Sequence, residues 1–467
     1  MSIQRKLALW AALAALLPGL PLKADTEQQS DTISREEFNG LQGDLQTLRD
    51  DETRQFQRLT ANTLRFVQFG GTIQTRYTFR DDGNPAYPNQ LTIPLVQLTI
   101  RGSLYKDYAD GHNLDFSLGL QSGSVTVPAG NANVTAFSLA DANLTYAILA
   151  TSDLTKPYLS VTLGQQLKIF GSEPQVTEAY KPTINPATWV ANEGLQTRDI
   201  GLTFSGDFFP NADFGNNYRV ALISYQLGLF NGSGQNTSTN VAKLPAGATD
   251  NSTAYTYPVA DNNQDKDLYA RIAFNAPVDY NHWARGLTLG FSAAQFHNPG
   301  ANQGAAGNIV NGDLQSVRYG ADLSYVNVPV GFTLEYIQGE DEQLTGTTPA
   351  NTYLWVKQSY GGTATLFYEW GQQFVKDFVN QSRQDDYYPK TYQVFVRGDV
   401  WNPNSGGNGT GANATQNDVI IGTVGFNAWF ASTTKFQFNY QARKNDIGYG
   451  SASFTSDQYL AQFQYGF

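Results

Sequence analysis

The chain ends with the stretch Tyr459-Leu-Ala-Gln-Phe-Gln-Tyr-Gly-Phe467. Tyrosine, alanine and phenylalanine occupy every second position of it, and the residues between them are leucine, glutamine and glycine. Successive side chains of a β-strand point to opposite faces, so a period of two residues indicates a strand with one aromatic face. A terminal aromatic residue behind such a run is typical of the closing strand of an outer-membrane β-barrel.

The same alternation recurs upstream of this strand. Between residues 435 and 443, for example, phenylalanine, tyrosine and alanine alternate with lysine, glutamine, asparagine and arginine. About sixteen such segments start near residues 65, 92, 112, 138, 157, 198, 217, 267, 286, 315, 329, 354, 391, 418, 434 and 456. An even number of antiparallel strands is the rule for single-chain bacterial barrels. We therefore predict an all-β fold, a transmembrane barrel of about sixteen strands over residues 64–467.

The residue types on the two faces favour a membrane protein over a soluble β-sandwich. One face is rich in phenylalanine, tyrosine and leucine, and the other carries basic residues. An arginine that faces lipid at the bilayer midplane costs roughly 2 to 4 kcal/mol. Five would cost on the order of 10 to 20 kcal/mol, comparable with the stability of a whole fold. The basic side chains are therefore predicted to line a water-filled lumen: Arg76, Arg101, Lys168, Arg271, Arg318, Arg397 and Arg443.

Composition excludes several other classes. Charged residues make up 15% of the chain, against roughly 25% in ordinary soluble domains. The net charge of −11 argues against a nucleic-acid binder. The chain has no cysteine and three histidines, and no Ser/His/Asp set or metal-ligand spacing is recognisable. We expect neither an enzyme nor a cofactor or metal site.

The N-terminus reads as a secretory signal. Arg5 and Lys6 precede an apolar run from Leu7 to Leu17, which is short for the ~20 residues of a spanning helix. Cleavage is expected after Ala24, so residues 1–24 form the signal peptide and the mature chain is exported. The absence of cysteine is compatible with an oxidising periplasm.

Residues 25–63 are polar and lead into the first strand. Phe38, Leu41, Leu45 and Leu48 follow the 3,4,3 spacing of a heptad seam. This spacing predicts a short periplasmic helix, either in a coiled coil between protomers or alone as an amphipathic helix. A disordered leader is the third alternative.

The connections between the predicted strands differ in length. Short links at 326–330 and 430–433 are predicted to be periplasmic turns. Long polar links at 231–267, 297–314, 339–351 and 402–417 are predicted to be external loops. The link at 371–390 is long although parity puts it on the periplasmic side, and the sequence offers no physical reason for it.

The segment 170–197 follows the fifth strand and is the third external connection. It contains three prolines and Trp189, together with four charged residues, Glu173, Glu178, Lys181 and Glu193. Links longer than about 15 residues are usually functional or disordered. We predict that this one folds into the lumen as a constriction, the alternative being an ordinary outer loop. Its carboxylates would then stand across from the basic strand residues and create a transverse field.

Three stretches resemble a known family. The sequences RDIGL at 198–202, YQLGLFNGSG at 225–234 and DLYAR at 267–271 are similar to the phosphate-selective porin O and P family. The resemblance implies a trimeric, sixteen-stranded porin with an inward third loop and a basic ladder. By position, the ladder candidates are Arg76, Arg101, Arg271, Arg318 and Arg397. Loop lysines are scarce, however, and inward acids accompany the arginines: Asp115, Asp141, Asp322, Glu335, Glu369 and Asp399.

The sequence thus predicts an outer-membrane porin for passive diffusion of small hydrophilic solutes and ions. A preference for anions, phosphate among them, is the narrower expectation. The expected partners are two further copies of the chain, outer-membrane lipid and small polar or anionic solutes. The alternative from another class is a structural or adhesive barrel that does not conduct.

Overall fold

The structure is a computed structural model that divides the chain into two units, Met1–Arg65 and Phe66–Phe467. It describes residues 67–80, 89–106, 113–126, 133–149, 157–178, 180–213, 218–232, 266–303, 309–327, 329–345, 353–371, 388–405, 417–431, 433–447 and 454–467. The predicted signal peptide and the predicted helix at 25–63 lie outside the described residues.

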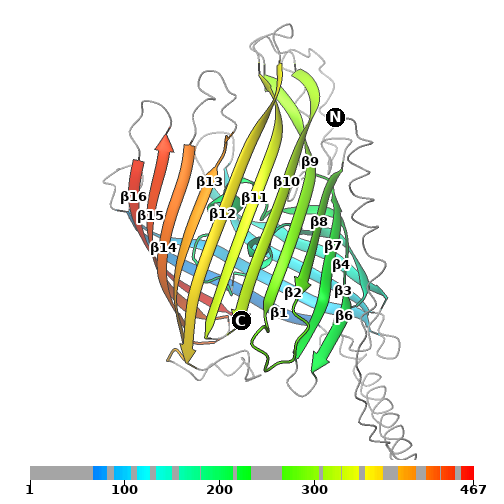
Figure 1. The fold of residues 1–467 in the computed structure, drawn as a ribbon, viewed down its shortest axis with the longest axis vertical. Helices are drawn as coiled ribbons and strands as arrows, with labels where there is room; N and C mark the ends of the chain where they lie inside the picture. The colour runs from blue at the N-terminus through cyan, green and yellow to red at the C-terminus, as the bar shows by residue number, and fades with distance from the viewer. Residues whose placement is uncertain are drawn as a thin grey trace, which may run out of the picture. The chain divides into compact units, whose positions relative to one another are not determined.

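The described residues form sixteen antiparallel strands in one closed barrel (Figure 1). The first eight are β1 (Val67–Arg80), β2 (Gln90–Lys106), β3 (Asn113–Thr126), β4 (Asn133–Leu149), β5 (Leu159–Leu167), β6 (Arg198–Asp213), β7 (Tyr218–Phe230) and β8 (Asp267–Asn275). The others are β9 (Leu287–Gln303), β10 (Ile309–Asn327), β11 (Val330–Thr345), β12 (Tyr353–Gly371), β13 (Thr391–Asn402), β14 (Asn417–Trp429), β15 (Lys435–Ile447) and β16 (Phe454–Gly466).

Each strand pairs with its sequence neighbours, and β16 closes the ring by pairing with β1. In that pairing Tyr77 lies opposite Ala461 and Ile73 opposite Tyr465. The backbone N–H of Gly71 donates to the carbonyl of Phe467 over 2.9 Å, and the Phe467 N–H donates back to Gly71 over 3.1 Å. The sixteen-stranded barrel and its closing strand are therefore confirmed.

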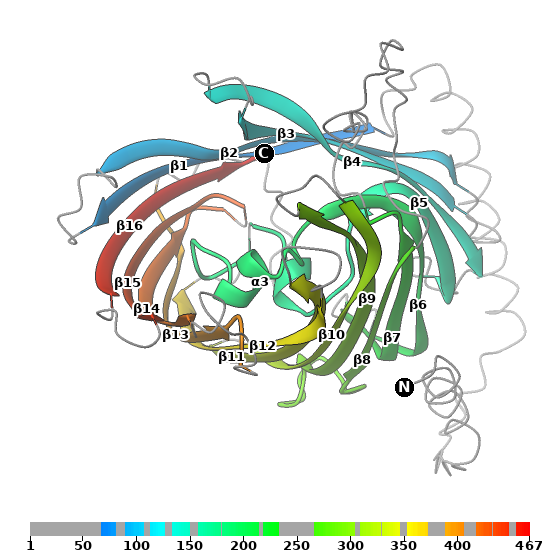
Figure 2. The same cartoon turned by 90° about the horizontal axis from the view of Figure 1, so that it is seen from above.

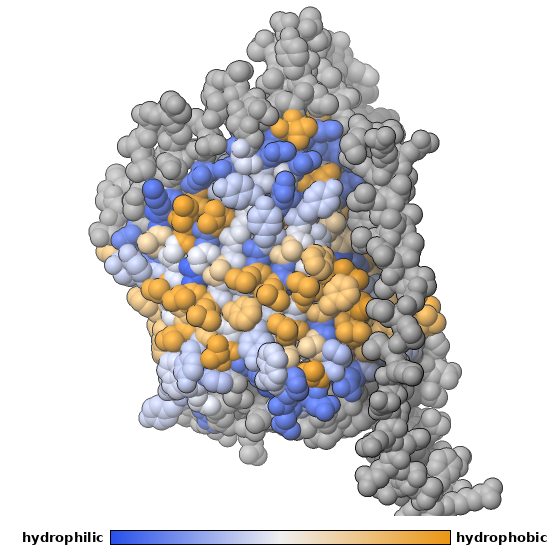
Figure 3. Space-filling model, viewed as in Figure 1, coloured by the Kyte–Doolittle hydropathy of each residue, from blue (hydrophilic) through white to orange (hydrophobic). Residues whose placement is uncertain are grey.

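The two faces of the strands differ as predicted. On β1, Phe69, Ile73 and Tyr77 are exposed on the outside, whereas Gln74 and Thr78 are buried on the inside. Figure 3 shows the result as a band of hydrophobic residues at mid-height on the visible face of the barrel. Apolar side chains are stable on such a surface when lipid covers them, which is the arrangement of a transmembrane barrel.

In the described part of the chain, no helix is long and apolar enough to cross a bilayer.

Two predicted loops are mostly strand, which is a correction. β9 and β10 remain paired up to Gln303 and Ile309, so most of the predicted loop at 297–314 is strand. β11 and β12 likewise remain paired up to Thr345 and Tyr353, within the predicted loop at 339–351. Backbone pairing continues there without an apolar face, which sequence periodicity needs in order to detect a strand.

The other boundaries agree closely. β4 and β10 begin at Asn133 and Ile309, earlier than expected, and the remaining strands begin within two residues of their predicted starts. The links 231–266 and 403–416 separate strands as predicted. The unexplained link after Gly371 lies outside the described residues from 372 to 387.

The chain between β5 and β6 lies inside the ring of strands (Figure 2). We call residues 168–197 the inner segment; the structure describes all of it except Ala179. It contains a 3-10 turn, η2 (Glu173–Gln175), and a short helix, α3 (Thr188–Asn192). The main hydrophobic cluster of the molecule forms between this segment and the inner barrel wall.

Candidate pore constriction

One side of the inner segment forms a hydrophobic cluster with the wall. Phe170 and Trp189, each 1% exposed, meet edge to face with 6.4 Å between ring centroids. The wall contributes apolar residues from β7, β8, β9, β11 and β13: Phe230, Tyr269, Ala294, Phe296, Ile337 and Trp401. Gly361 on β12 permits the close approach, because a Cβ there would stand 2.4 Å from the Cβ of Trp189. We call this region, the inner faces of β7–β13 with the segment against them, the packed side.

Glu335 on β11 holds the start of the inner segment. Its Oε1 accepts hydrogen bonds from the backbone N–H groups of Ser172 and Glu173, over 2.9 and 2.6 Å, and a further one from the Ser172 hydroxyl. Ser292 on β9 accepts the N–H of Gly171 over 3.0 Å. A carboxylate that accepts several backbone donors fixes their direction, so the turn at 171–173 is tied to the wall.

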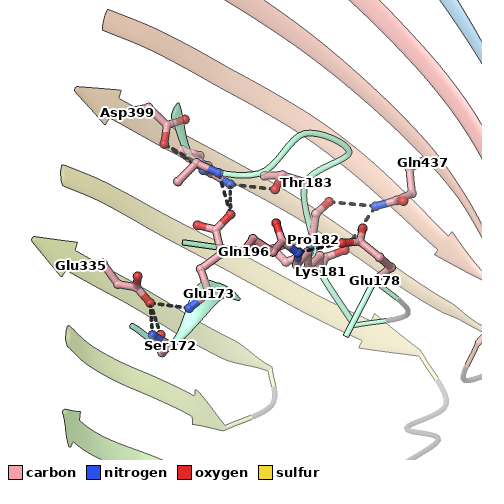
Figure 4. A network of polar contacts seen from close by, with 12 residues as sticks. Ser172, Glu173, Glu178, Lys181, Pro182, Thr183, Gln196, Glu335, Asp399 and Gln437 are labelled. Carbon is pink, nitrogen blue, oxygen red and sulfur yellow. Dashed lines mark hydrogen bonds and ion pairs between the residues drawn. The ribbon is translucent and has the colours of Figure 1, made fainter. Parts of the chain in front are cut away.

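Arg397 on β13 joins the segment to the same wall. Its Nη1 donates to Thr183 over 2.7 Å and to Glu173 over 3.2 Å, and its Nη2 lies 2.8 Å from Asp399. Glu173 in turn accepts the N–H of Ala187 over 2.7 Å. Figure 4 shows Glu173 between Glu335 on one side and Thr183 on the other. The buried guanidinium is thus fully engaged in contacts within the protein.

Arg318 on β10 makes a similar set of contacts. It lies 2.7 Å from Glu193 of the inner segment and 2.7 Å from Asp341 on β11. The indole of Trp401 donates to the other oxygen of Glu193 over 3.0 Å. These contacts change the predicted transverse field, because Glu173 and Glu193 touch the arginines directly and do not face them across a gap.

Two further ion pairs neutralise charge on the strands. Arg271 on β8 donates from Nη2 to Asp322 on β10 over 2.9 Å. Arg198 lies 2.8 Å from Asp141 on β4. The acids that accompany the predicted ladder are therefore direct partners of several basic residues. Burying such charges is tolerable only when they are paired.

A cavity of about 310 Å³ borders the other side of the inner segment. Arg76 and Arg80 of β1 and Arg443 of β15 line it, together with Asp399 and residues 185, 186 and 188 of the segment. Arg76 donates to Gln462 over 2.9 Å and to Asn185 over 3.1 Å. We call this region the cavity side. The three segment residues that line it are asparagine, proline and threonine, so they add no charge.

The other predicted residues are more scattered. Arg101 on β2 is exposed and lies opposite Gln68 and Ser117. The ammonium of Lys168, at the root of the segment, stands 5.6 Å from the Tyr269 ring centroid. Burial lowers the pKa of Lys168 below its usual value, and the nearby carboxylates of Asp199 and Asp267 act in the opposite direction.

Lys181 and Glu178 form an ion pair of 2.7 Å within the segment. Sequence reasoning did not single out several residues that touch the segment or line the cavity, among them Arg80, Asn427, Lys435, Gln437 and Gln441. Alternation already assigned Lys435 and Gln437 to the inward face, but it carries no information about what a side chain meets there.

No group of three or more potential metal ligands occurs among the described residues. His282 lies in the β8–β9 connection, where its Nδ1 accepts the N–H of Ala284 over 3.1 Å. His297 lies on β9, and His112 is outside the described ranges.

Comparison with known proteins identifies the architecture. No family model and no curated protein matches the chain. An anion-selective porin from Comamonas acidovorans matches with a TM-score of 0.50 and 11% identity, over 86% of this chain and 99% of that one. OmpF of Salmonella typhi, in complex with daunomycin, matches with a TM-score of 0.50 and 14% identity, over 86% and 97%.

The chain has a porin fold. At these identities the likeness extends to the fold alone. The narrower resemblance to the phosphate-selective O and P family stays a prediction.

Proposed function

We propose that this porin barrel lets small hydrophilic solutes and ions diffuse passively across the bacterial outer membrane. The observation that carries the proposal is the polar cavity between the wall and the inner segment of a closed barrel. Its volume of about 310 Å³ has room for several water molecules. The passage therefore suits hydrated ions and small polar molecules.

The distribution of charge supports a preference for anions. On the packed side, Arg271, Arg318 and Arg397 lie against carboxylates, so their fields largely cancel. The residues that line the cavity include three arginines and one aspartate, Asp399, which lies 2.8 Å from Arg397, and each of the three arginines also interacts with other groups of the chain. A water-filled cleft with an excess of one sign concentrates ions of the other sign. Phosphate is among the anions that we expect to be favoured, because guanidinium groups bind its oxygens well.

Assembly and location form part of the same proposal. We expect a homotrimer in the outer membrane, as the resemblance of the sequence to trimeric porins implies, with lipid against the remaining apolar surface. Chemical cross-linking of the detergent-solubilised protein should give a species of three chains. A stable monomer that conducts would contradict the proposed trimer but would agree with the proposed pore.

Planar-bilayer recording tests the pore. The purified protein should produce stepwise conductance, and its reversal potential under a salt gradient should show that anions pass more readily than cations. The triple variant Arg76→Gln/Arg80→Gln/Arg443→Gln should lose that preference while keeping its conductance. A folded barrel without conductance would instead support the structural or adhesive alternative.

A further inference from the structure

We propose that Lys435, with Gln437 and Asn427, positions the inner segment and thereby sets the bore of the pore. The three residues lie on β14 and β15 and hold backbone carbonyls at 178–182. The inference rests on the proposed pore function, because a bore has meaning only in a channel. It concerns the part of the wall where the segment is held by neither the hydrophobic cluster nor a strand-to-segment ion pair.

Lys435 is a fully buried cation at the first position of β15. Its exposed fraction is 0%. The ammonium donates to the carbonyl oxygens of Glu178 and Lys181 over 3.0 and 2.7 Å, and lies 5.8 Å from the Trp429 ring centroid. The Lys435 nitrogen can donate both hydrogen bonds in either protonation state, because a neutral amine still carries two N–H groups. A single side chain thus ties together two carbonyls of one turn.

Two amide side chains extend this contact to the next carbonyl. Gln437 donates from Nε2 to Lys181 and Pro182 over 3.3 and 3.1 Å, as Figure 4 shows. Asn427 donates from Nδ2 to Pro182 over 2.9 Å. We call Asn427, Lys435 and Gln437 the carbonyl clamp. All of its donors come from the wall and all of its acceptors from the segment backbone.

The clamp is itself held rigidly by neighbouring amides. The Gln437 Nε2 also donates to Asn427 over 3.2 Å, and Gln462 on β16 donates to Gln437 over 3.3 Å. Gln393 on β13 accepts from Asn427 over 2.9 Å. Donors that are oriented before they bind lose little freedom on binding. The clamp can therefore define a position for the segment.

The clamp forms the second of two anchors. The first is the Glu335 and Arg397 set, which holds residues 172, 173 and 183 against β11 and β13. The clamp holds residues 178–182 against β14 and β15. The residues of the segment that line the cavity, 185, 186 and 188, follow these attachment points directly along the chain. Freeing the clamp would therefore change the width of the passage.

Because the clamp residues are buried, their role in positioning the segment can be tested separately from ion selection. Since Lys435 and Gln437 are 0% and 1% exposed, a passing solute cannot touch them. Gln437→Leu removes clamp donors without changing charge, so it should alter conductance and leave the reversal potential unchanged. Lys435→Met should have the larger effect on conductance. Lys444→Met, at an exposed position of the same strand, is the matched control for the lost charge.

Single-channel recording of these variants is the first experiment. Loss of a hydrogen bond should raise the population of displaced segment conformers on the order of tenfold. Lys435→Met should therefore give larger and noisier openings than the native chain, and Lys444→Met should match the native chain. Retention of heat-modifiable mobility in detergent gels checks that each barrel is folded.

A labelling experiment gives a readout that does not need conductance. The chain has no cysteine, so Ile184→Cys introduces a single thiol at a position that is 4% exposed. Its reaction with a water-soluble maleimide should accelerate about tenfold when Lys435→Met is added, and not when Lys444→Met is added. Equal rates and equal conductance in both backgrounds would overturn the clamp. A folded native protein that does not conduct would overturn the pore instead, and the labelling rates would still decide about the clamp.

Discussion

Residues on the packed side of the lumen and residues on its cavity side differ in how far they are exposed. On the packed side, Trp189 is 1% exposed and Arg318 is 4% exposed. On the cavity side, Asn185 and Pro186 of the inner segment are half-buried and Arg443 is exposed. The same short segment therefore forms a dry core with one part of its surface and a wet boundary with another.

The difference explains why the arginines of the lumen are not equivalent. An arginine in a dry environment needs a carboxylate, because an unpaired buried charge is very costly. Arg318 and Arg397 meet this requirement with Glu193, Asp341, Glu173 and Asp399. Near water, an arginine can remain solvated and act on mobile ions. Selectivity is therefore expected from the cavity side, and positioning of the constriction from the packed side together with the carbonyl clamp on β14 and β15.

Truncation of the core tryptophan should have the largest effect. Trp189→Ala should remove about 3 to 5 kcal/mol of packing free energy, the usual cost for a large buried aromatic. The strand pairs are untouched, so the loss should appear as a displaced inner segment and a larger single-channel conductance. Trp283→Ala, at a position that is 72% exposed, is the control. Equal conductance in the two variants would show that the packed side does not position the segment.

Overpacking of the same contact should have a smaller effect. Gly361→Ala puts a methyl group 2.4 Å from the Cβ of Trp189, and such strain typically costs about 1 to 3 kcal/mol. The segment should shift toward the cavity and reduce conductance. Gly398→Ala on β13 meets no atom within 4 Å and should leave conductance unchanged. The prediction fails if the two alanine variants conduct alike.

Selectivity should depend on the cavity side alone. Arg443→Gln removes a charge that interacts with an ion in contact with it by about 1 kcal/mol in water. This energy corresponds to about a fivefold change in the local concentration of anions. The anion-to-cation permeability ratio from reversal potentials should fall by up to that factor. Arg271→Gln/Asp322→Asn deletes an ion pair at the edge of a second cavity, of about 350 Å³, without changing net charge, and should leave the ratio unchanged. A shift in the double variant would place part of the selectivity on the packed side.

An increase in salt concentration should produce the smallest change in ion preference. The Debye length falls from about 10 Å at 0.1 M to about 3 Å at 1 M. The anion preference of the native pore should weaken over this range as the field of the cavity arginines is screened. Reversal potentials at a fixed concentration ratio and rising total salt measure the effect. A preference that is independent of salt would indicate direct anion binding in place of a long-range field.

Much of the barrel could be predicted from sequence because its signal is local. Most strand starts follow from a period of two residues, as in the closing strand from Tyr459 to Phe467. The prediction was wrong at 297–314 and 339–351, where strands pair without an apolar face. The contacts of the inner segment could not be predicted in the same way, since the partners are far apart in the chain. Arg397 and Glu173, for example, are 224 residues apart.

By itself, the sequence determined a barrel of about sixteen strands, the alternation between its two faces and the segment that departs from the pattern. Alternation is sufficient to predict these features because neighbouring residues of a strand face lipid and water in turn, and lipid requires apolar side chains whereas water accepts polar ones. Only the tertiary structure decided that Arg318 and Arg397 are paired, that Arg76, Arg80 and Arg443 line a cavity, and that Lys435 binds carbonyls. These outcomes depend on where the inner segment lies, and its position results from contacts with strands distributed around the ring.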